Sequence, residues 1–565
     1  MRLTTPGLSG PGSGAAEFSL VSSMLKALML QAAAASGLRD SFDAREATID
    51  GVHNALFTGL TTCRGVVSSF ISRIEEYNPT INAIIGLNPD ALSIADELDQ
   101  RLLTGNTTGK LFCVPVLLKD NYDATPMNTT GACLALAGNK PTADAPVVKV
   151  LKSEGAIIIG KVNLHELALE GISVSSLGGQ TANPYDRTRT PGGSSGGTGA
   201  AIAASFAVFG TGTDTVNSLR SPASANSLVS VRPTRGLISR AGVIPISYTQ
   251  DTVGPMARSV KDLAVALTVM ASVGFDETDN ATALVPPEVI GKDYSAELYG
   301  GSLKGMRFGA LDGFWNHTTS SETTPVNDAM GDMVGFLKSE GAVIVNITDA
   351  IYNATEILTT MDVQQLEYRE MLDEYLTGPG LQVTAPASFN ELYTSGKFVV
   401  IPSQYGYVNN AFVSSTGNAS YAVRQLAIKN LTNALFSTFS SNKLDAIMYP
   451  EQKNLVVKIG SPSQSGRNGI LAALTGVPVV TVPAGFSPPS EDAPIGVPVG
   501  MEIMGLPFSE GKLLNIASEI THLRPVRKMP ISTNRSVETK NYSALPVISP
   551  DNGNIAAAYP IGVLS

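Results

Sequence analysis

Histidine is scarce in this chain of 565 residues, which contains only four. They are His53, His165, His317 and His522, and they share no metal-ligand spacing. Each is therefore interpreted as an ordinary structural or surface residue. This scarcity argues against zinc chemistry and against a Ser-His-Asp hydrolase, and the sequence predicts no metal site.

Cysteine is also rare. The three residues are Cys63, Cys113 and Cys133, and an odd number excludes a framework in which every cysteine is paired within the chain. Cys113 lies shortly before Lys119, so it could line a site built around that lysine. The alternative is that Cys113 is a small buried apolar residue, and both interpretations stay open.

Two further absences limit the partners of the chain. No apolar run approaches 18 residues, so no transmembrane segment is predicted. The formal net charge is −10, from 39 basic and 49 acidic side chains, and no basic stripe is visible. Nucleic acid and anionic membranes are therefore not expected as partners. The chain is 43% hydrophobic and 16% charged, which predicts a substantial core.

A short apolar stretch near the N-terminus predicts export from the cell. It runs from Met24 to Leu30 and is followed by small residues up to Ala35, as in a secretory signal peptide with a cleavage site. Translation could begin at Met24, and an N-terminal helix packed on the domain is the alternative. The predicted location is the secretory pathway or the exterior, with the cytoplasm as the alternative.

Ten Asn-x-Ser/Thr sequons agree with a secreted glycoprotein. Their asparagines are Asn106, Asn128, Asn280, Asn316, Asn346, Asn353, Asn418, Asn430, Asn534 and Asn541. A chain rich in Ser, Thr and Asn contains several such sequons by chance. The sequons therefore support the signal peptide without establishing it.

A strand–helix–strand rhythm predicts the fold class. Residues 111–118 form an apolar run typical of a buried strand, Pro146 opens a helix that ends near Gly155, and residues 156–160 form the next strand. Such alternation is typical of a sheet that is mostly parallel or mixed. The prediction is an α/β protein with a single large domain, in which helices cover a central mixed β-sheet.

The predicted organisation has three parts. Residues 1–40 are rich in Gly, Ser and Ala and are expected to be a flexible N-terminus. Residues 41–530 are expected to form the domain, with a helical insertion at about 280–440. Residues 531–565 are expected to form a loosely packed C-terminal tail.

Two serines and a lysine carry the candidate chemistry. Ser194 lies inside the glycine-rich run Gly192–Gly197, and Ser218 follows 24 positions later. Lys119 follows the apolar run Val114–Leu118, so its side chain is expected to be partly desolvated. A serine hydroxyl is a weak nucleophile until a base takes its proton, and a lysine can be that base only when burial lowers its pKa.

These segments resemble the amidase signature family, whose serine hydrolases use a Ser-Ser-Lys triad. The similarity spans roughly residues 45–525 and includes five further segments at residues 232–239, 242–245, 251–260, 475–485 and 498–508. Because no histidine takes part in the triad, the resemblance agrees with the scarcity of histidine. It implies the family's α/β fold and an amidase activity without a cofactor.

The resemblance also implies a role for each residue. Ser218 would attack the amide carbonyl and form an acyl-enzyme, Ser194 would relay the proton, and Lys119 would be the base. The peptide bond before Ser194 would be cis. The oxyanion hole would be built from Thr215, Val216, Asn217 and Ser218, and the substrate would be bound by Gly193, Val216 and Asn217.

The chain departs from the family just before the nucleophile. Most members have two glycines there, whereas this chain has Val216 and Asn217. Asparagine tolerates a positive φ better than other non-glycine residues, but valine does not. The backbone donors remain, while their direction and the width of the acyl pocket could change. The expected substrate is a small-molecule or peptide amide.

Other interpretations of the same residues stay open. The run Gly193–Gly197 fits the G-x-S-x-G pattern, which would make Ser195 the nucleophile of an α/β-hydrolase. That fold needs a later histidine, and only His317 and His522 follow. The remaining alternatives are transfer of the acyl group to an amine, a non-catalytic amide-binding protein and one subunit of a glutamine amidotransferase.

Overall fold

The computed structural model describes residues 42–296, 298, 300–382 and 386–553. The stretch from Met24 to Ala35, on which the predicted signal peptide depends, lies outside these residues. The predicted flexible N-terminus at 1–40 lies outside them as well. Both therefore stay predictions.

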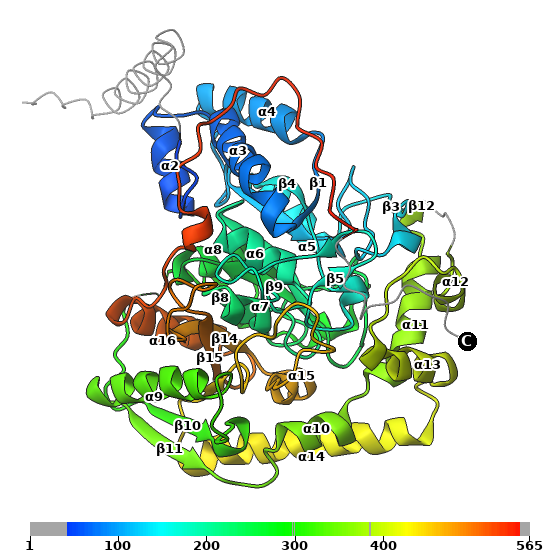
Figure 1. Ribbon diagram of the computed structural model, residues 1–565, viewed down its shortest axis with the longest axis vertical. Helices are drawn as coiled ribbons and strands as arrows, with labels where there is room; N and C mark the ends of the chain where they lie inside the picture. Colours follow the sequence, from blue (N-terminus) through cyan, green and yellow to red (C-terminus); the bar gives the residue numbers. More distant parts are fainter. Residues whose placement is uncertain (1–41, 297, 299, 383–385, 554–565) are drawn as a thin grey trace, which may run out of the picture.

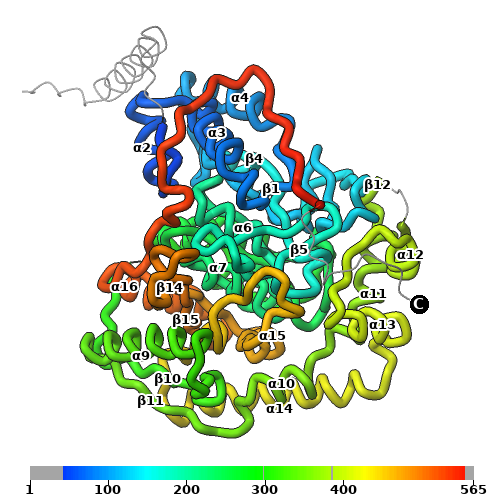
Figure 2. The backbone as a smooth tube through the Cα atoms, viewed as in Figure 1, coloured from blue at the N-terminus to red at the C-terminus, as the bar shows by residue number. Residues whose placement is uncertain are grey.

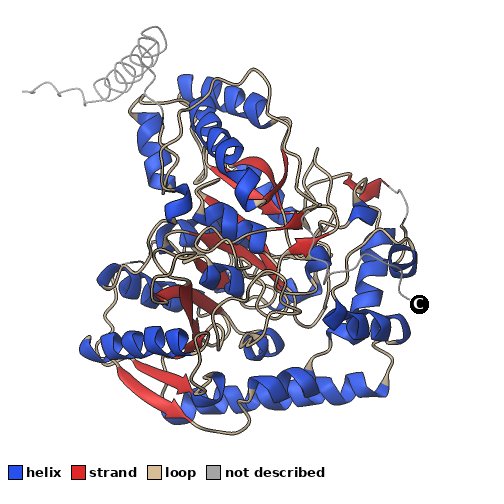
Figure 3. Cartoon of the chain, in the orientation of Figure 1, coloured by secondary structure: helices blue, strands red, loops and turns tan. Residues whose placement is uncertain are grey.

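A mixed sheet of eleven strands runs through the described residues and is flanked by helices (Figure 3). Towards one edge of this sheet, β2 (Pro115–Lys119) pairs in parallel with β4 (Ile157–Val162) and β7 (Phe209–Asp214). The helix α5 (Pro146–Ser153) connects β2 to β4, as the sequence predicts. This architecture confirms the predicted α/β fold class.

The other strands continue the sheet on both sides of β4, β2 and β7. Beyond β4 lies β1 (Ile84–Leu87), and beyond β7 follow, in sheet order, β9 (Thr252–Ala257), β8 (Val229–Arg232), β14 (Val479–Phe486), β15 (Pro498–Met504), β13 (Ala446–Pro450), β10 (Arg307–Leu311) and β11 (Val343–Ile347). From β7 to β13 each neighbouring pair is antiparallel. The strands near β2 are buried along their whole length, which fits a sheet with both faces covered.

Helices cover the sheet over its whole length (Figure 1). Among them, α8 packs on β9, whereas α9 and α16 pack on β14. Threonine and serine caps begin several of them; the side chain of Thr62, for example, accepts a hydrogen bond from the N–H of Gly65 at the start of α3. The helices besides α5 are α2 (Ile49–Phe57), α3 (Cys63–Ile81), α4 (Ala91–Leu103), α6 (Gly196–Ala203), α7 (Arg220–Ala225), α8 (Val260–Met270), α9 (Thr324–Ser339), α10 (Ala354–Met361), α11 (Gln364–Thr377), α12 (Phe389–Thr394), α13 (Tyr405–Val413), α14 (Ala419–Asn442), α15 (Ile470–Thr475) and α16 (Glu510–Leu523).

The segment 280–440 contains more than helices. It holds α9 to α14, but it also contributes β10 and β11, which pair in parallel with each other. β10 pairs in parallel with β13 as well, so this part of the chain extends the central sheet. The division of the chain at residues 41, 280, 440 and 530 stays a prediction.

The C-terminal segment up to residue 553 runs along α3 and α4 (Figure 2). The phenol of Tyr542 donates a hydrogen bond to Glu75 at 2.7 Å. Further along, the N–H of Asp551 donates to Asn82 Oδ1 at 3.1 Å. These contacts tie the segment to the first helices, so its described part is more firmly attached than a loosely packed tail.

Two of the three cysteines form a disulfide. Cys63, at the start of α3, is bonded to Cys113, and their Cα atoms lie 5.4 Å apart. Cys113 therefore serves neither as a free thiol nor as a lining residue of the cavities near Lys119. Cys133 is a buried free thiol. Among the described helices, none combines the length and the apolar character needed to cross a bilayer.

Candidate functional site

Lys119 lies at the end of β2 with no exposed side chain surface. Its Nζ donates a hydrogen bond to Ser194 Oγ at 2.7 Å and another to Thr213 Oγ1 at 2.8 Å. Burial lowers the pKa of Lys119 to about 7, although the carboxylates of Asp214 and Asp251 act in the opposite direction. A large fraction of Lys119 is thus a neutral amine near neutral pH, as a general base must be.

Ser194 is held by backbone contacts just before α6. The Gly193–Ser194 peptide bond is cis, as the resemblance implied. The Ser194 carbonyl accepts a hydrogen bond from the N–H of His165 at 3.0 Å, and the Ser173 hydroxyl donates to the carbonyl of Gly192 at 2.8 Å. Gly192 has a φ of +70°, which favours glycine. The glycine-rich run therefore lets the chain turn so that the Ser194 hydroxyl faces Lys119.

Ser218 lies beside this segment and just before α7. Its carbonyl accepts a hydrogen bond from the N–H of Ser195 at 3.2 Å, and its side chain lines a cavity of about 490 Å³. Ser195 itself is fully buried, and its hydroxyl bonds the backbone of Thr213. The structure thus brings Lys119, Ser194 and Ser218 into adjoining segments, while the Ser195 hydroxyl is enclosed in backbone.

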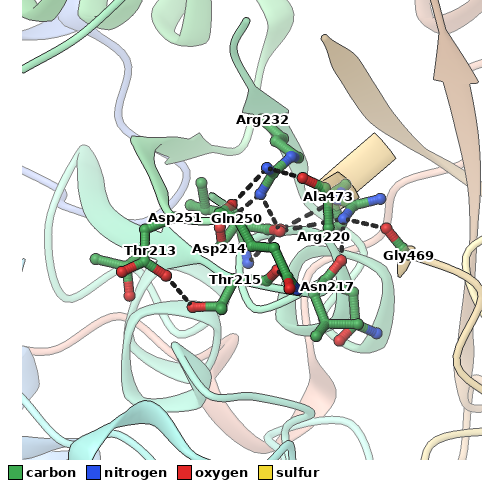
Figure 4. Close-up of polar contacts among 12 residues, drawn as sticks. Thr213, Asp214, Thr215, Asn217, Arg220, Arg232, Gln250, Asp251, Gly469 and Ala473 are labelled. Carbon is green, nitrogen blue, oxygen red and sulfur yellow. Dashed lines mark hydrogen bonds and ion pairs between the residues drawn. The ribbon is translucent and has the colours of Figure 1, made fainter. Parts of the chain in front are cut away.

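A buried ionic cluster holds the loop between β7 and α7 (Figure 4). Arg220 Nε lies 3.0 Å from Asp214 Oδ2, and Arg232 Nη1 lies 2.7 Å from Asp214 Oδ1. Burial disfavours the charge on Asp214, but the two guanidinium groups outweigh it and hold the pKa of that carboxyl well below its usual range. Arg220 also donates to the carbonyls of Val216 and Gly469, so the same side chain fixes the loop.

Three of the residues expected in the oxyanion hole are anchored through their own side or main chains. The hydroxyl of Thr215 donates to Asp251 at 2.6 Å, and the amide of Asn217 donates to Glu451 Oε1 at 2.8 Å. The carbonyl of Val216 is bound by Arg220. These anchors orient the backbone N–H groups that precede Ser218.

Sequence reasoning missed Asp251 and Glu451 as partners of this loop. Glu451 lies 234 positions beyond Asn217 and follows β13 without a recognisable motif around it. Asp251 falls inside a segment similar to the family, but no local pattern links it to Thr215. Neither partnership could be inferred from spacing, because it depends on how the strands are ordered in the sheet.

The cavity next to Ser218 has a polar lining. Glu170 forms an ion pair with Arg467, and the amide of Gln404 donates to Glu170 at 2.8 Å. The Gln404 Oε1 and Tyr407 hydroxyl oxygens are buried and have no hydrogen-bond partner among the described residues. These two groups can therefore bind polar groups of a ligand.

The three residues expected to bind substrate differ in their positions. Val216 lines the cavity, whereas Gly193 and Asn217 are buried and are not among its lining residues. A second cavity of about 240 Å³ shares Thr215 and Ala168 with the first. Within the described ranges, no group of three His, Cys, Asp or Glu side chains is placed to hold a metal ion.

Comparisons with known proteins identify the family of the chain. A family model described as Amidase matches residues 65–514. A protein of Arabidopsis thaliana described as a probable amidase is 32% identical over 523 residues, covering 89% of this chain and 96% of that protein. One subunit of the glutamyl-tRNA(Gln) amidotransferase of Alkaliphilus metalliredigens is 32% identical, covering 84% and 95%. The native peptide amidase from Stenotrophomonas maltophilia is 31% identical and has a TM-score of 0.74, covering 86% of this chain and 98% of that one.

Because of the ionic cluster, we expect the removal of Arg220 to lower the free energy of unfolding substantially. In Arg220→Leu the carboxylate of Glu502 would lose its cation, and a buried unpaired charge costs about 3–5 kcal/mol. A denaturant titration measures the loss as a lower unfolding midpoint. The matched control is Lys261→Ala, since the side chains of the Lys261–Asp50 pair are 45% and 64% exposed and such pairs contribute less than about 1 kcal/mol. Equal midpoints for the two variants would contradict this account of the cluster.

Proposed function

Because the chain belongs to the Amidase family, it is a hydrolase of amide carbon–nitrogen bonds, and we propose that it works through Lys119, Ser194 and Ser218. The observation that carries the proposal is the hydrogen bond of 2.7 Å between Lys119 Nζ and Ser194 Oγ, at a lysine whose pKa burial lowers to about 7. Ser218 supports it, because it lines the cavity and its carbonyl accepts a hydrogen bond from the N–H of Ser195, the residue after Ser194.

In the proposed mechanism, proton transfer accompanies the attack. Ser218 Oγ bonds to the amide carbon while its proton passes to Ser194 Oγ, and the Ser194 proton passes to the neutral Lys119 Nζ. When the carbon–nitrogen bond breaks, the protons return along the same path and the leaving amine takes one. Water then attacks the acyl-enzyme, with the same groups removing its proton, and releases the carboxylic acid.

The proposed oxyanion hole consists of backbone N–H groups at Thr215, Val216, Asn217 and Ser218. One fixed donor of this kind contributes roughly 3–4 kcal/mol to lowering the barrier. The anchors on Asp251, Arg220 and Glu451 support this assignment, because they restrain the loop before the substrate binds. Donors that are already oriented need no reorganisation when charge develops on the carbonyl oxygen.

The proposed substrate is a small-molecule or peptide amide with polar groups beside the scissile bond. The unpartnered oxygens of Gln404 and Tyr407 and the charges of Glu170 and Arg467 suit such a group better than an alkyl chain. Val216 narrows the cavity near the nucleophile. The peptide amidase among the similar structures agrees with this class of substrate. Acyl transfer would use the same acyl-enzyme and differs only in the acceptor.

We also propose that the chain is exported and N-glycosylated. The asparagines of nine sequons are exposed, and the tenth, Asn316, is half-buried, so their side chains are accessible to a glycosyltransferase. The Cys63–Cys113 disulfide supports export as well, because disulfides persist in oxidising compartments.

The first prediction from the proposed function concerns the nucleophile. Ser218→Ala should abolish amide hydrolysis, because no other group can form the proposed acyl-enzyme, whereas Ser195→Ala should retain most of the activity. Release of amine from a peptide amide measures both rates. Ser195 is a matched control, since it lies one residue after Ser194 and carries the same hydroxyl. Activity lost in Ser195→Ala and kept in Ser218→Ala would favour the α/β-hydrolase interpretation.

The second prediction concerns the base. Since Lys119 must be neutral and its pKa is about 7, kcat should fall about tenfold per pH unit below pH 7 and level off above it. Lys119→Ala should lower kcat by several orders of magnitude. Lys119→Arg should not restore it, because a guanidinium does not lose its proton. A fully active Lys119→Arg enzyme would exclude a lysine base.

The third prediction concerns export. Expression of the full chain in a eukaryotic host should give protein in the medium whose mass falls after endoglycosidase treatment. N-terminal sequencing should show that the segment up to about residue 35 has been removed. Protein that stays in the cytosol with an unprocessed N-terminus and no change of mass would contradict it.

A further inference from the structure

Asn217, the residue before the proposed nucleophile, is bound by a carboxyl group that lies far away in the sequence. Its Nδ2 donates to Glu451 Oε1 at 2.8 Å, and both residues are buried, with Asn217 2% and Glu451 0% exposed. The N–H of Glu451 in turn donates to the carbonyl of Gly500 in β15 at 3.0 Å. Through the side chain of Asn217, the loop before Ser218 is thereby linked to Glu451 and, through the Glu451 backbone, to β15.

Glu451 differs from Asp214 and Glu502 because no ion pair within the described residues joins it to a cation, whereas both of those acids bind arginine. Glu502 Oε2 lies 2.7 Å from Arg220 Nη1, and Asp214 binds both Arg220 and Arg232. Glu451 receives only the neutral amide of Asn217, and its Oε2 has no hydrogen-bond partner within the described part of the chain. A buried carboxylate oxygen without a donor is costly, so an uncharged carboxyl fits this position better.

The titratable groups that interact with Glu451 are Glu502 in β15, Arg220 in α7, Asp214 at the end of β7 and Tyr449 in β13. Arg232 in β8 belongs to the same cluster through its ion pair with Asp214. Tyr449 stays neutral, because burial raises the pKa of its phenol well above the usual value. The two guanidinium groups balance two carboxylates, so a third carboxylate would leave the cluster with a net negative charge.

Burial and this charge imbalance both favour the protonated form of Glu451. Burial, followed by repulsion from Glu502, raises the pKa of Glu451. Glu451 and Glu502 repel each other when both are ionised, so one of them keeps its proton. Because Arg220 binds Glu502 and not Glu451, Glu502 is the ionised acid and Glu451 the protonated one. At neutral pH the Asn217 amide is therefore held by a neutral acid.

We propose that Glu451 is a positioning residue: its uncharged carboxyl holds Asn217 and the oxyanion donors in place, and its ionisation at alkaline pH slows hydrolysis. The inference rests on the proposed function, because it assigns the donors to the loop before Ser218. An ionised Glu451 places a negative charge beside donors that must stabilise a developing oxyanion, in a region of low dielectric. This raises the barrier of the chemical step without changing how the substrate is bound.

The test is a kcat profile from pH 5 to pH 10 on a peptide amide, for the wild type and for Glu451→Gln. The wild type should show a rising limb that belongs to Lys119 and a falling limb at higher pH, of about tenfold per pH unit. Glu451→Gln can still accept from Asn217 but cannot ionise, so it should keep the rising limb and lose the falling one. Its kcat near pH 7.5 should stay within about threefold of the wild type, with an unchanged KM.

A matched control separates this effect from the loss of any buried acid. Glu510, the first residue of α16, is also fully buried with a raised pKa, and its Oε1 accepts from the N–H of Thr234, which follows β8. Glu510→Gln should keep the falling limb. Thermal unfolding of each variant at pH 7 and at pH 9.5 distinguishes loss of activity from loss of structure.

Asn217→Ala tests the same contact from the other side. It should lower kcat about tenfold, because the oxyanion N–H donors are no longer held in the correct direction. KM should stay nearly unchanged, because the groups that bind the substrate remain. A wild-type profile without a falling limb, a falling limb that persists in Glu451→Gln, or an unchanged kcat in Asn217→Ala would overturn the proposal. If the proposed triad were wrong, the rising limb of the kcat profile would not depend on Lys119. This outcome distinguishes a failure of the triad from a failure of the role proposed for Glu451.

Discussion

The site depends on keeping one amine uncharged inside the protein. Lys119 is buried at the end of β2, and the groups its Nζ contacts are the neutral hydroxyls of Ser194 and Thr213. An ammonium group there would be desolvated without a carboxylate in direct contact, so the neutral form is favoured down to about pH 7. The strand that carries Lys119 lies between two parallel neighbours, β4 and β7, and is buried along its whole length, which keeps water from the amine.

A second constraint complements the first, because the buried ion pairs at this site do not involve Lys119 but the residues that hold the loop before Ser218. Asp214, Arg220, Arg232 and Glu502 form a nearly balanced buried network, and it fixes the main chain that leads to Ser218. Buried ion pairs contribute little net stability, but removing one partner is costly. The network therefore serves as a rigid frame. Val216 and Asn217 do not adopt a positive φ, so neither position requires glycine. Arg220 holds the carbonyl of Val216, and Glu451 holds the side chain of Asn217.

The sequence predicted the parts that depend on local patterns. The apolar run before Lys119 became β2, Pro146 opened α5, and the glycine-rich run placed Ser194 against Lys119. What it did not predict depends on contacts across the sheet. Inside the segment 280–440, β11 is exposed or half-buried at four of its five positions, so it lacks the pattern of a buried strand. β10 is buried except at Arg307, and its place in the sheet depends on pairing with the distant β13. The Asn217–Glu451 contact joins two strand ends that only the strand order brings together. The Cys63–Cys113 pair likewise required the three-dimensional arrangement.

We propose that Ser218 is the nucleophile of an amidase whose base is a neutral lysine. Covalent labelling with a fluorophosphonate, followed by digestion and mass spectrometry, tests it most directly, because the reagent phosphonylates an activated serine and needs no knowledge of the substrate. The account predicts a single adduct on the peptide that contains Ser218, formed at a rate that rises with pH around 7 and is lost in Lys119→Ala. An adduct on Ser195, or labelling of Ser218 that is unchanged in Lys119→Ala, would contradict it.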